Sequence, residues 1–236
     1  MTKGIIYYTD NRLGEPIYSI VQDQLLKVGL PIVSCSQQPI DFGANVVVGD
    51  GKNYLTMIKQ ITAALEASVA DTVFFCEHDV LYPLSHFDFE PRIKSTFYYN
   101  DNVWRWKYPT GMAISYDRLI SLSGLCANRQ FVLDHYHKRL ERIVRMPLKD
   151  QEARDPKWAR KWGYEPGTKK RKRGGFADDD FETWKSAYPI VDIRHPLVFS
   201  PSKVTKESFI HQPTGWKETT IEKIPGWNLK ELFKLS

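Results

Sequence analysis

The first 83 residues alternate between two patterns of apolar and polar positions. Unbroken apolar or β-prone runs predict buried strands, and apolar residues spaced three or four positions apart predict amphipathic helices. The runs predict strands at 3–9, 31–36 and 71–79, and the helical spacing predicts helices at 14–30 and 53–70. Strands that alternate with helices in this way indicate an α/β fold, with a mostly parallel central sheet and helices on both faces.

The rest of the chain is less regular and is richer in short segments. We expect strands at 96–100, 103–109, 111–117 and 190–200, and helices at 129–146 and 180–189. Residues 203–236 form a polar tail. Neither a repeat nor a linker interrupts the sequence, so we predict a single domain over 1–236, with halves at 1–83 and 84–202.

The composition is that of a globular protein, with 42% hydrophobic and 13% aromatic residues. No apolar run approaches the roughly 20 residues that a membrane helix needs, and the first ten residues are expected to form a strand and not a signal peptide. Three cysteines, Cys35, Cys76 and Cys126, stand far apart among apolar neighbours. This spacing favours reduced core thiols over a disulfide frame or a zinc site, and it predicts a cytoplasmic protein.

The formal net charge of +5 is concentrated in one segment. Residues 157–175 are rich in lysine and arginine and contain a single acidic residue, Glu165. Such a block usually forms a solvated loop. The aromatic residues between the charges, Trp158, Trp162 and Tyr164, leave open a phosphate-rich or nucleic-acid partner.

Two carboxylates and an imidazole end the strand expected at 71–79, in the stretch VFFCEHDVLYP. Side chains alternate along an extended chain, so Glu77 and Asp79 are expected to point the same way. Such a pair repels itself unless a proton or a cation lies between the charges. Carboxylate oxygens suit Mg²⁺ or Mn²⁺, together with the oxygens of a substrate phosphate. The alternative is an acidic turn at the surface, balanced by a lysine or an arginine.

Thr9 and Asp10 end the first predicted strand in a similar way. The carboxyl ends of parallel strands share one edge of a sheet, and ligands bind at that edge in open α/β folds. A second polar site is therefore expected beside Glu77 and Asp79. The alternative is that Thr9 and Asp10 only cap the next turn.

This order of elements, followed by CEHD and by short aromatic strands, resembles that of the GT-A-type glycosyltransferases from Lys3 to about Ser202. The resemblance implies a single Rossmann-like GT-A domain in which residues 1–83 bind a nucleotide and residues 84–202 bind an acceptor. It also implies that Glu77-His78-Asp79 corresponds to the family's D-x-D triplet, which holds Mn²⁺ or Mg²⁺ against the diphosphate of a nucleotide-sugar. Glutamate replaces the first aspartate here, which puts a direct metal contact from that position in doubt.

The same resemblance implies roles for residues elsewhere. Thr9 and Asp10 would hydrogen-bond the base or the ribose, and Lys59 would contact the nucleotide from the helix before the metal strand. A late histidine supplies a further metal ligand in the family: His195 in DIRHPLVFS is the first candidate, and His211 in FIHQP is the reserve. Each has an ordinary alternative, because Lys59 could be an exposed helical lysine and either histidine a buried core residue.

The family's late acidic motif corresponds to GGFADDDFETW, in which the acidic residues follow a flexible double glycine. An inverting transfer needs a carboxylate that takes the proton of the acceptor hydroxyl. We predict Asp179 as this base, with Asp180 as the second candidate, because neighbouring carboxylates raise one another's pKa. The alternative is an acidic helix N-terminus that the helix dipole favours.

The acceptor side is expected in the aromatic strand at 103–109. Trp104, Trp106 and Tyr108 alternate there and would form one exposed stripe that stacks on a sugar or a base. The alternative is a strand whose aromatic face belongs to the core. Arg173 in the basic segment is the further candidate for acceptor binding.

These features predict a metal-dependent glycosyltransferase that moves a sugar from a nucleotide-sugar donor to a hydroxyl acceptor. One candidate acceptor is DNA with hydroxymethylated bases, because the basic segment suits a polyanion and compact bacteriophage members of this broad family modify such DNA. A nucleotidyltransferase is one alternative, although YYTDNRLGEP has little of the Gly-rich basic loop that such enzymes carry. A non-enzymatic nucleic-acid-binding protein is the other, and it would leave the acidic clusters without a purpose.

Overall fold

A seven-stranded sheet forms the centre of the protein in the computed structural model, which describes residues 1–49, 51–149, 152, 154, 160–168, 180–198 and 202–235. Its strands, in spatial order, are β10 (Phe181–Trp184), β6 (Phe97–Asn100), β9 (Leu125–Asn128), β4 (Thr72–Glu77), β1 (Lys3–Tyr8), β2 (Ile32–Ser36) and β3 (Ala44–Val47). Four of the six neighbouring pairs are parallel, and the two antiparallel pairs both involve β9. The mostly parallel sheet predicted from the sequence is confirmed.

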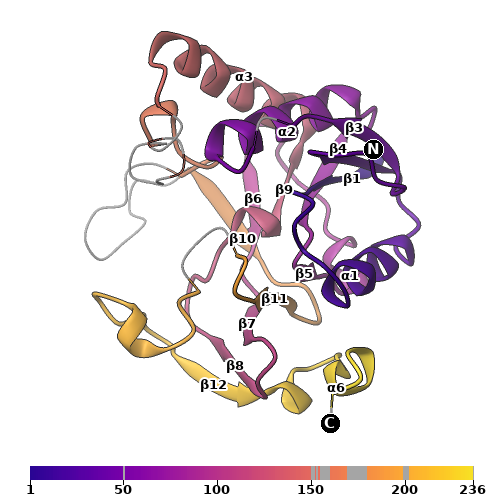
Figure 1. Cartoon of the computed structure of the whole chain (residues 1–236), viewed down its shortest axis with the longest axis vertical. Coiled ribbons are helices and arrows are strands. Elements are labelled where there is room, and N and C mark those ends of the chain that lie inside the picture. The colour runs from indigo at the N-terminus through magenta and orange to yellow at the C-terminus, as the bar shows by residue number, and fades with distance from the viewer. Residues whose placement is uncertain are drawn as a thin grey trace.

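Helices cover both faces of this sheet, as predicted (Figure 1). Helix α1 (Ile17–Leu26) packs on the face that carries Ile5 and Tyr7 of β1. Helices α2 (Tyr54–Ala67) and α3 (Arg129–Arg145) pack on the opposite face, with the alternate β1 residues. The period-two alternation of β1 therefore divides the apolar interior into two clusters.

A second, five-stranded sheet lies beside the first and was not predicted from the sequence. Its strands, in spatial order, are β12 (Lys217–Thr220), β8 (Met112–Ser115), β7 (Val103–Lys107), β11 (Ile190–Arg194) and β5 (Val80–Leu81). The C-terminal segment belongs to this unit, because β12 pairs with β8 and Phe233, just after α6 (Leu229–Leu232), packs edge-on against Trp106 at 4.8 Å. The 3₁₀ helices are η1 (Leu84–His86), η2 (Leu122–Gly124), η3 (Arg160–Trp162), η4 (Lys206–Ser208) and η5 (Ile221–Lys223).

The helix expected at 180–189 is a strand. Phe181–Trp184 pairs in parallel with β6, and Trp184 stacks on Phe89 at 4.2 Å. The acidic residues before this segment resemble a helix N-terminus, but aromatic and β-branched side chains favour a strand where a neighbouring strand offers its edge. The three cysteines are buried free thiols, as the sequence predicted. No helix in the described parts of the chain combines the length and the apolar character that a membrane crossing requires.

Gly43 marks a tight approach between β2 and the start of β3. Its φ is +64°, and a Cβ at this position would lie 2.5 Å from the carbonyl oxygen of Ile32. Replacing Gly43 with alanine should destabilise the protein by about 1–3 kcal/mol, because both the backbone conformation and the contact become strained. Urea unfolding measures the effect. Gly14→Ala is the control, since a Cβ there meets no atom within 4 Å; equal effects of the two substitutions would contradict the prediction.

Candidate active site

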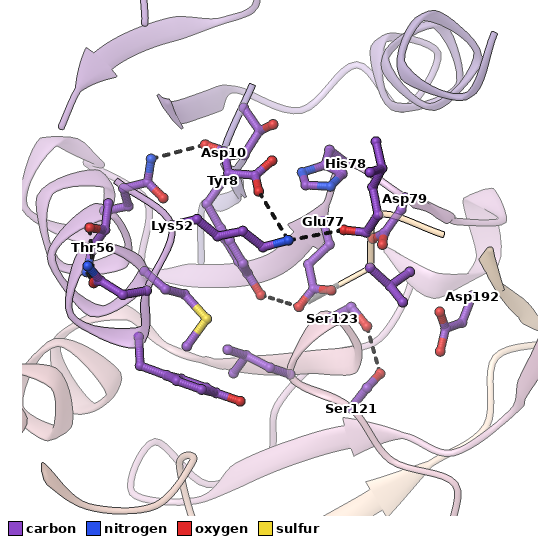
Figure 2. Close-up of a pocket in the computed structure, with 18 of the residues that line it drawn as sticks. Tyr8, Asp10, Lys52, Thr56, Glu77, His78, Asp79, Ser121, Ser123 and Asp192 are labelled. Carbon is purple, nitrogen blue, oxygen red and sulfur yellow. Dashed lines mark hydrogen bonds and ion pairs between the residues drawn. The ribbon is translucent and has the colours of Figure 1, made fainter. Parts of the chain in front are cut away.

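A pocket of about 260 Å³ opens at the carboxyl ends of β1 and β4 (Figure 2). The start of α2, the loop around η2 and the end of β11 complete its wall. This is the edge of a parallel sheet at which ligands bind in open α/β folds. The position predicted from the strand ends therefore does contain a pocket.

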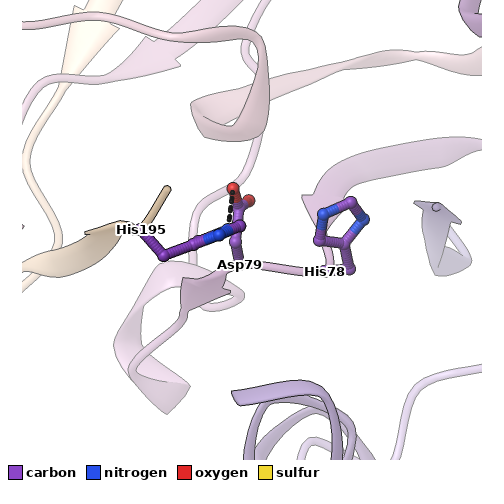
Figure 3. Close-up of side chains that lie close together, drawn as sticks. All are labelled: His78, Asp79 and His195. Atoms are coloured by element: carbon purple, nitrogen blue, oxygen red, sulfur yellow. Dashed lines mark hydrogen bonds and ion pairs between the residues drawn. The ribbon is translucent and has the colours of Figure 1, made fainter. Parts of the chain in front are cut away.

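Three side chains that can ligate a metal lie together in this region: His78, Asp79 and His195 (Figure 3). Each offers one ligand atom, and these atoms all lie within 4.8 Å of one another. His195 directly follows β11, and the antiparallel pairing of β11 with β5 places its Nε2 3.3 Å from Oδ2 of Asp79. The backbone N–H of Leu197 donates a hydrogen bond to Nδ1 of His195 at 3.2 Å, which orients the ring.

The donor set of this group fits a divalent transition metal. Two imidazole nitrogens and one carboxylate oxygen suit Mn²⁺ better than Mg²⁺, which prefers oxygen ligands alone. Nδ1 of His78 is shielded from solvent and has no hydrogen-bond partner within the described ranges, so it is available to a ligand. The group could hold a divalent cation.

The structure groups Asp79 and His195, two of the predicted ligands, with His78 and not with Glu77. The alternation that would align Glu77 with Asp79 stops because β4 ends at Glu77 and the chain then turns. Glu77 instead accepts a hydrogen bond from the hydroxyl of Tyr8 at 2.5 Å. Its role as a metal ligand stays a prediction. His78 was not predicted as a ligand, because a fully extended chain would point its side chain away from Glu77 and Asp79.

The pKa values of Glu77 and Asp79 are shifted in opposite directions. Burial raises the pKa of Glu77 to about 8, and the charge of Asp79 acts in the same direction, whereas the hydrogen bond from Tyr8 lowers it. Burial also raises the pKa of Asp79, but the hydrogen bond from His195 and the nearby positive charges outweigh it, so that the net pKa is lowered. Asp79 is therefore the anionic member of the pair and the stronger candidate for a cation.

The predicted nucleotide contacts divide into two groups. Thr9 and Asp10 line the pocket, and Gln60 of α2 donates to the carbonyl oxygen of Thr9 at 3.0 Å. Lys59 also lies on α2 but is not part of the described pocket lining. Lys52, just before this helix, does line the pocket; its Nζ lies 4.0 Å from Oδ2 of Asp10. No sequence pattern favours Lys52, because its place at the pocket depends on where β3 ends and α2 begins.

The N-terminus of α2 opens toward the same pocket. Asn53 caps the helix, and its side-chain oxygen accepts from the backbone N–H of Thr56 at 2.8 Å. The exposed amides and the dipole of a helix N-terminus favour phosphate and other anions. With Lys52 beside it, this part of the pocket is suited to negative charge.

A buried ion network forms the side of the pocket next to the second sheet. Asp192 of β11 accepts from Nε of Arg105 at 3.1 Å and from Nη1 of Arg194 at 3.2 Å, and its side chain is only 5% exposed. Arg105 also donates to the hydroxyl of Tyr116 at 3.0 Å. Asp192 and Arg194 belong to the segment IVDIRH, which was considered for His195 in the sequence analysis. The second sheet, which brings Arg105 beside Asp192, was not predicted.

The other predicted residues lie outside this pocket or outside the described residues. Asp180 is exposed and precedes β10, away from the pocket lining. Asp179 and Arg173 lie outside the described residues. His211 is exposed and does not belong to the metal-ligating group found among the described residues.

The aromatic strand β7 faces the core for the most part. Trp106 is fully buried, and its Nε1 donates to the carbonyl oxygen of Thr110 at 2.5 Å. Trp104 is half-buried and packs against the same core cluster. Trp106 is therefore a core residue, as the alternative in the sequence analysis had it. An acceptor role for Trp104 stays a prediction.

No family model matches this sequence, and no curated protein matches it. Solved structures that resemble part of the chain include two glycosyltransferases. One is a glycosyltransferase involved in the glycosylation of the major capsid of PBCV-1, with 10% identity and a TM-score of 0.39 over 62% of this chain and 69% of that chain. The other is the apo-form glycosyltransferase GlyE in Streptococcus pneumoniae TIGR4, with 8% identity and a TM-score of 0.35 over 65% of this chain and 42% of that chain. Both TM-scores lie below 0.5, so what this protein does is inferred from its own sheet edge and pocket.

Proposed function

We propose that this protein is a metal-dependent glycosyltransferase that moves a sugar from a nucleotide-sugar donor to a hydroxyl acceptor. The observation that carries the proposal is the group of His78, Asp79 and His195 at the carboxyl edge of a mostly parallel sheet, beside a pocket with a helix N-terminus. A cation site next to an anion site is what binding a diphosphate requires.

The parts of the pocket fit the parts of such a donor. The start of α2 and Lys52 suit the phosphates, and the carboxylate of Asp10 and the hydroxyl of Thr9 suit the hydroxyls of the ribose or the edge of the base. His78, Asp79 and His195 would hold Mn²⁺. The cation would supply charge neutralisation for the departing diphosphate.

The catalytic base and the acceptor remain proposals from the sequence. Asp179 is the proposed base, and the basic segment at 157–175 is the reason to test DNA with hydroxymethylated bases as the acceptor. An acceptor bound through phosphates should show a KM that rises steeply with salt concentration, because binding releases counterions. An acceptor KM that does not change with salt would contradict a DNA acceptor.

Two other enzyme classes share parts of this site. Nucleotidyltransferases use a similar sheet with carboxylates and a metal, and two histidines with one carboxylate also bind Fe²⁺ in oxygenases. The donor separates them: a glycosyltransferase binds nucleotide-sugars, a nucleotidyltransferase binds nucleoside triphosphates, and an Fe²⁺ oxygenase requires neither.

Thermal unfolding with UDP-, GDP-, ADP- and dTDP-sugars and with the matching nucleoside triphosphates, each with and without Mn²⁺ or Mg²⁺, tests the proposal. One nucleotide-sugar should raise the midpoint by about 5–10 °C at a hundred times its Kd, and only when a divalent cation is present. A larger rise with Mn²⁺ than with Mg²⁺ is expected from the imidazole ligands. A rise with triphosphates alone would identify a nucleotidyltransferase, and no metal-dependent rise with any nucleotide would overturn the proposal.

A further inference from the structure

Glu165 is a pocket residue that the metal site and the phosphate site do not use. It is the only acidic residue of the basic segment at 157–175, and it lies in the described stretch after η3. Its side chain is 33% exposed and forms part of the pocket wall. A carboxylate in this position can contact a bound ligand directly.

Two groups of helix α3 hold this carboxylate from behind. Nη1 of Arg139 donates to Oε2 of Glu165 at 3.3 Å, and the hydroxyl of Tyr136 donates to the same oxygen at 3.4 Å. The side chain of Arg139 is only 3% exposed. A buried ion pair adds little net stability, because the loss of hydration offsets the attraction. It does fix the direction of the carboxylate, and a fixed polar group is what a binding site needs.

The segment of Glu165 and the loop that carries Ser121 and Ser123 are both packed against strand β6. The hydroxyl of Tyr99 donates to the carbonyl oxygen of Pro166 at 2.7 Å, which anchors the residue after Glu165 to β6. Gly124, next to Ser123, packs so closely on the next residue of β6 that a Cβ would lie 3.0 Å from the carbonyl oxygen of Asn100. The segment of Glu165 and the loop of Ser121 and Ser123 therefore both approach the last residues of β6, and all three residues line the pocket.

The serines and the phosphate end of the pocket lie apart. Figure 2 shows Ser121 and Ser123 on the far side of Glu77 from Thr56 at the start of α2. Their Oγ atoms are hydrogen-bonded to each other at 2.6 Å, and both residues line the pocket. The pocket lining also includes Arg105 and Arg194, but both guanidinium groups are paired with the buried carboxylate of Asp192. This pairing leaves the oxygens of Glu165, Ser121 and Ser123 for a ligand here.

We propose that Glu165, with Ser121 and Ser123, binds the sugar of the donor and selects a neutral, hydroxyl-rich sugar over a hexuronic acid. This inference rests on the proposed glycosyltransferase function. Sugar hydroxyls donate strong hydrogen bonds to a carboxylate, and serine hydroxyls can both donate and accept. The carboxylate of a hexuronic acid would instead face the negative charge of Glu165.

Calorimetric titration in Mn²⁺ tests the inference with two matched pairs, UDP with UDP-glucose and GDP with GDP-mannose. Glu165→Gln should weaken binding of the recognised nucleotide-sugar by about tenfold, which is the effect of losing a hydrogen bond to a charged group. Binding of the matching nucleoside diphosphate should not change, because it lacks the sugar. The wild type should bind the hexuronate donor of the same nucleotide (UDP-glucuronate or GDP-mannuronate) more weakly than the hexose donor, and Glu165→Gln should narrow that difference.

Glu141→Gln is the matched control, since Glu141 pairs with Arg145 on the exposed surface of α3. Ser121→Ala is a second variant, which keeps the test valid if Glu165→Gln fails to fold. It should weaken binding of the nucleotide-sugar but not binding of the nucleoside diphosphate. An equal effect on both members of a pair, or no effect on either, would overturn the sugar site and leave the glycosyltransferase proposal standing. If the wild type binds none of the UDP-, GDP-, ADP- and dTDP-sugars in Mn²⁺, both proposals fall.

Discussion

Replacing Asp79 with asparagine should lower the affinity for Mn²⁺ by at least about a hundredfold. Asp79 is the carboxylate of the three-residue group, and its substitution leaves only the imidazoles of His78 and His195. Substituting a residue that only hydrogen-bonds to a metal ligand lowers the metal affinity by about 10–100-fold, so substituting a direct ligand should lower it by more. Titration of Mn²⁺ followed by electron paramagnetic resonance measures the free cation directly. The metal-dependent stabilisation by a nucleotide-sugar should disappear with it.

The same titration distinguishes the two possible ligand sets. Glu77→Gln should leave the affinity for Mn²⁺ nearly unchanged if His78, Asp79 and His195 form the site, because Glu77 bonds to Tyr8 instead. It should cause a loss like that of Asp79→Asn if Glu77 is a ligand. Asp134→Asn on the exposed side of α3 is the control. An unchanged Mn²⁺ affinity in Asp79→Asn would refute a metal site at this group.

Replacing Asp192 with asparagine should destabilise the protein by about 3–5 kcal/mol. The buried carboxylate neutralises Arg105 and Arg194, whose side chains are 13% and 8% exposed, and the substitution removes the negative charge that both guanidinium groups bind. Urea unfolding without metal or nucleotide measures this structural effect separately from any effect on ligand binding.

Asp134→Asn again serves as the control for Asp192→Asn, because it removes one carboxylate from a solvated helix surface. A loss for Asp192→Asn as small as that for Asp134→Asn would mean that water reaches the two guanidinium groups. The network would then not hold β7 and β11 together as the burial of Asp192 indicates.

The central sheet could be predicted because its strands and helices carry clear local patterns. The unbroken runs of β1, β2 and β4 and the helical spacing of α1 and α2 depend only on neighbouring residues, and the strand ends then placed Thr9, Asp10 and Asp79 at one edge. The choice of His195 also rested on a short local segment together with a resemblance, and the structure places it beside Asp79.

The second sheet could not be predicted because its strands are short and come from distant parts of the chain. β5 has two residues and gains its place by pairing with β11, more than a hundred positions later. The site residues that depend on this pairing or on turns were missed for the same reason: His78 follows the end of a strand, and Asp192 needs Arg105 from another strand. Glu165 was hidden by the positive charge of its segment.

The pairing of β5 with β11 also determines when the group of His78, Asp79 and His195 can form during synthesis. Asp79 and His195 are separated by 116 positions, so His78 and Asp79 leave the ribosome long before the third ligand has been made. Chains generally fold from the N-terminus as they emerge, and β1, β2 and β4 can pair early with their helices. A nascent chain that stops before β11 would therefore have the carboxyl edge of β1 and β4 but only two of the three residues of this group. The complete group of His78, Asp79 and His195 can form only after the second half of the chain has been made.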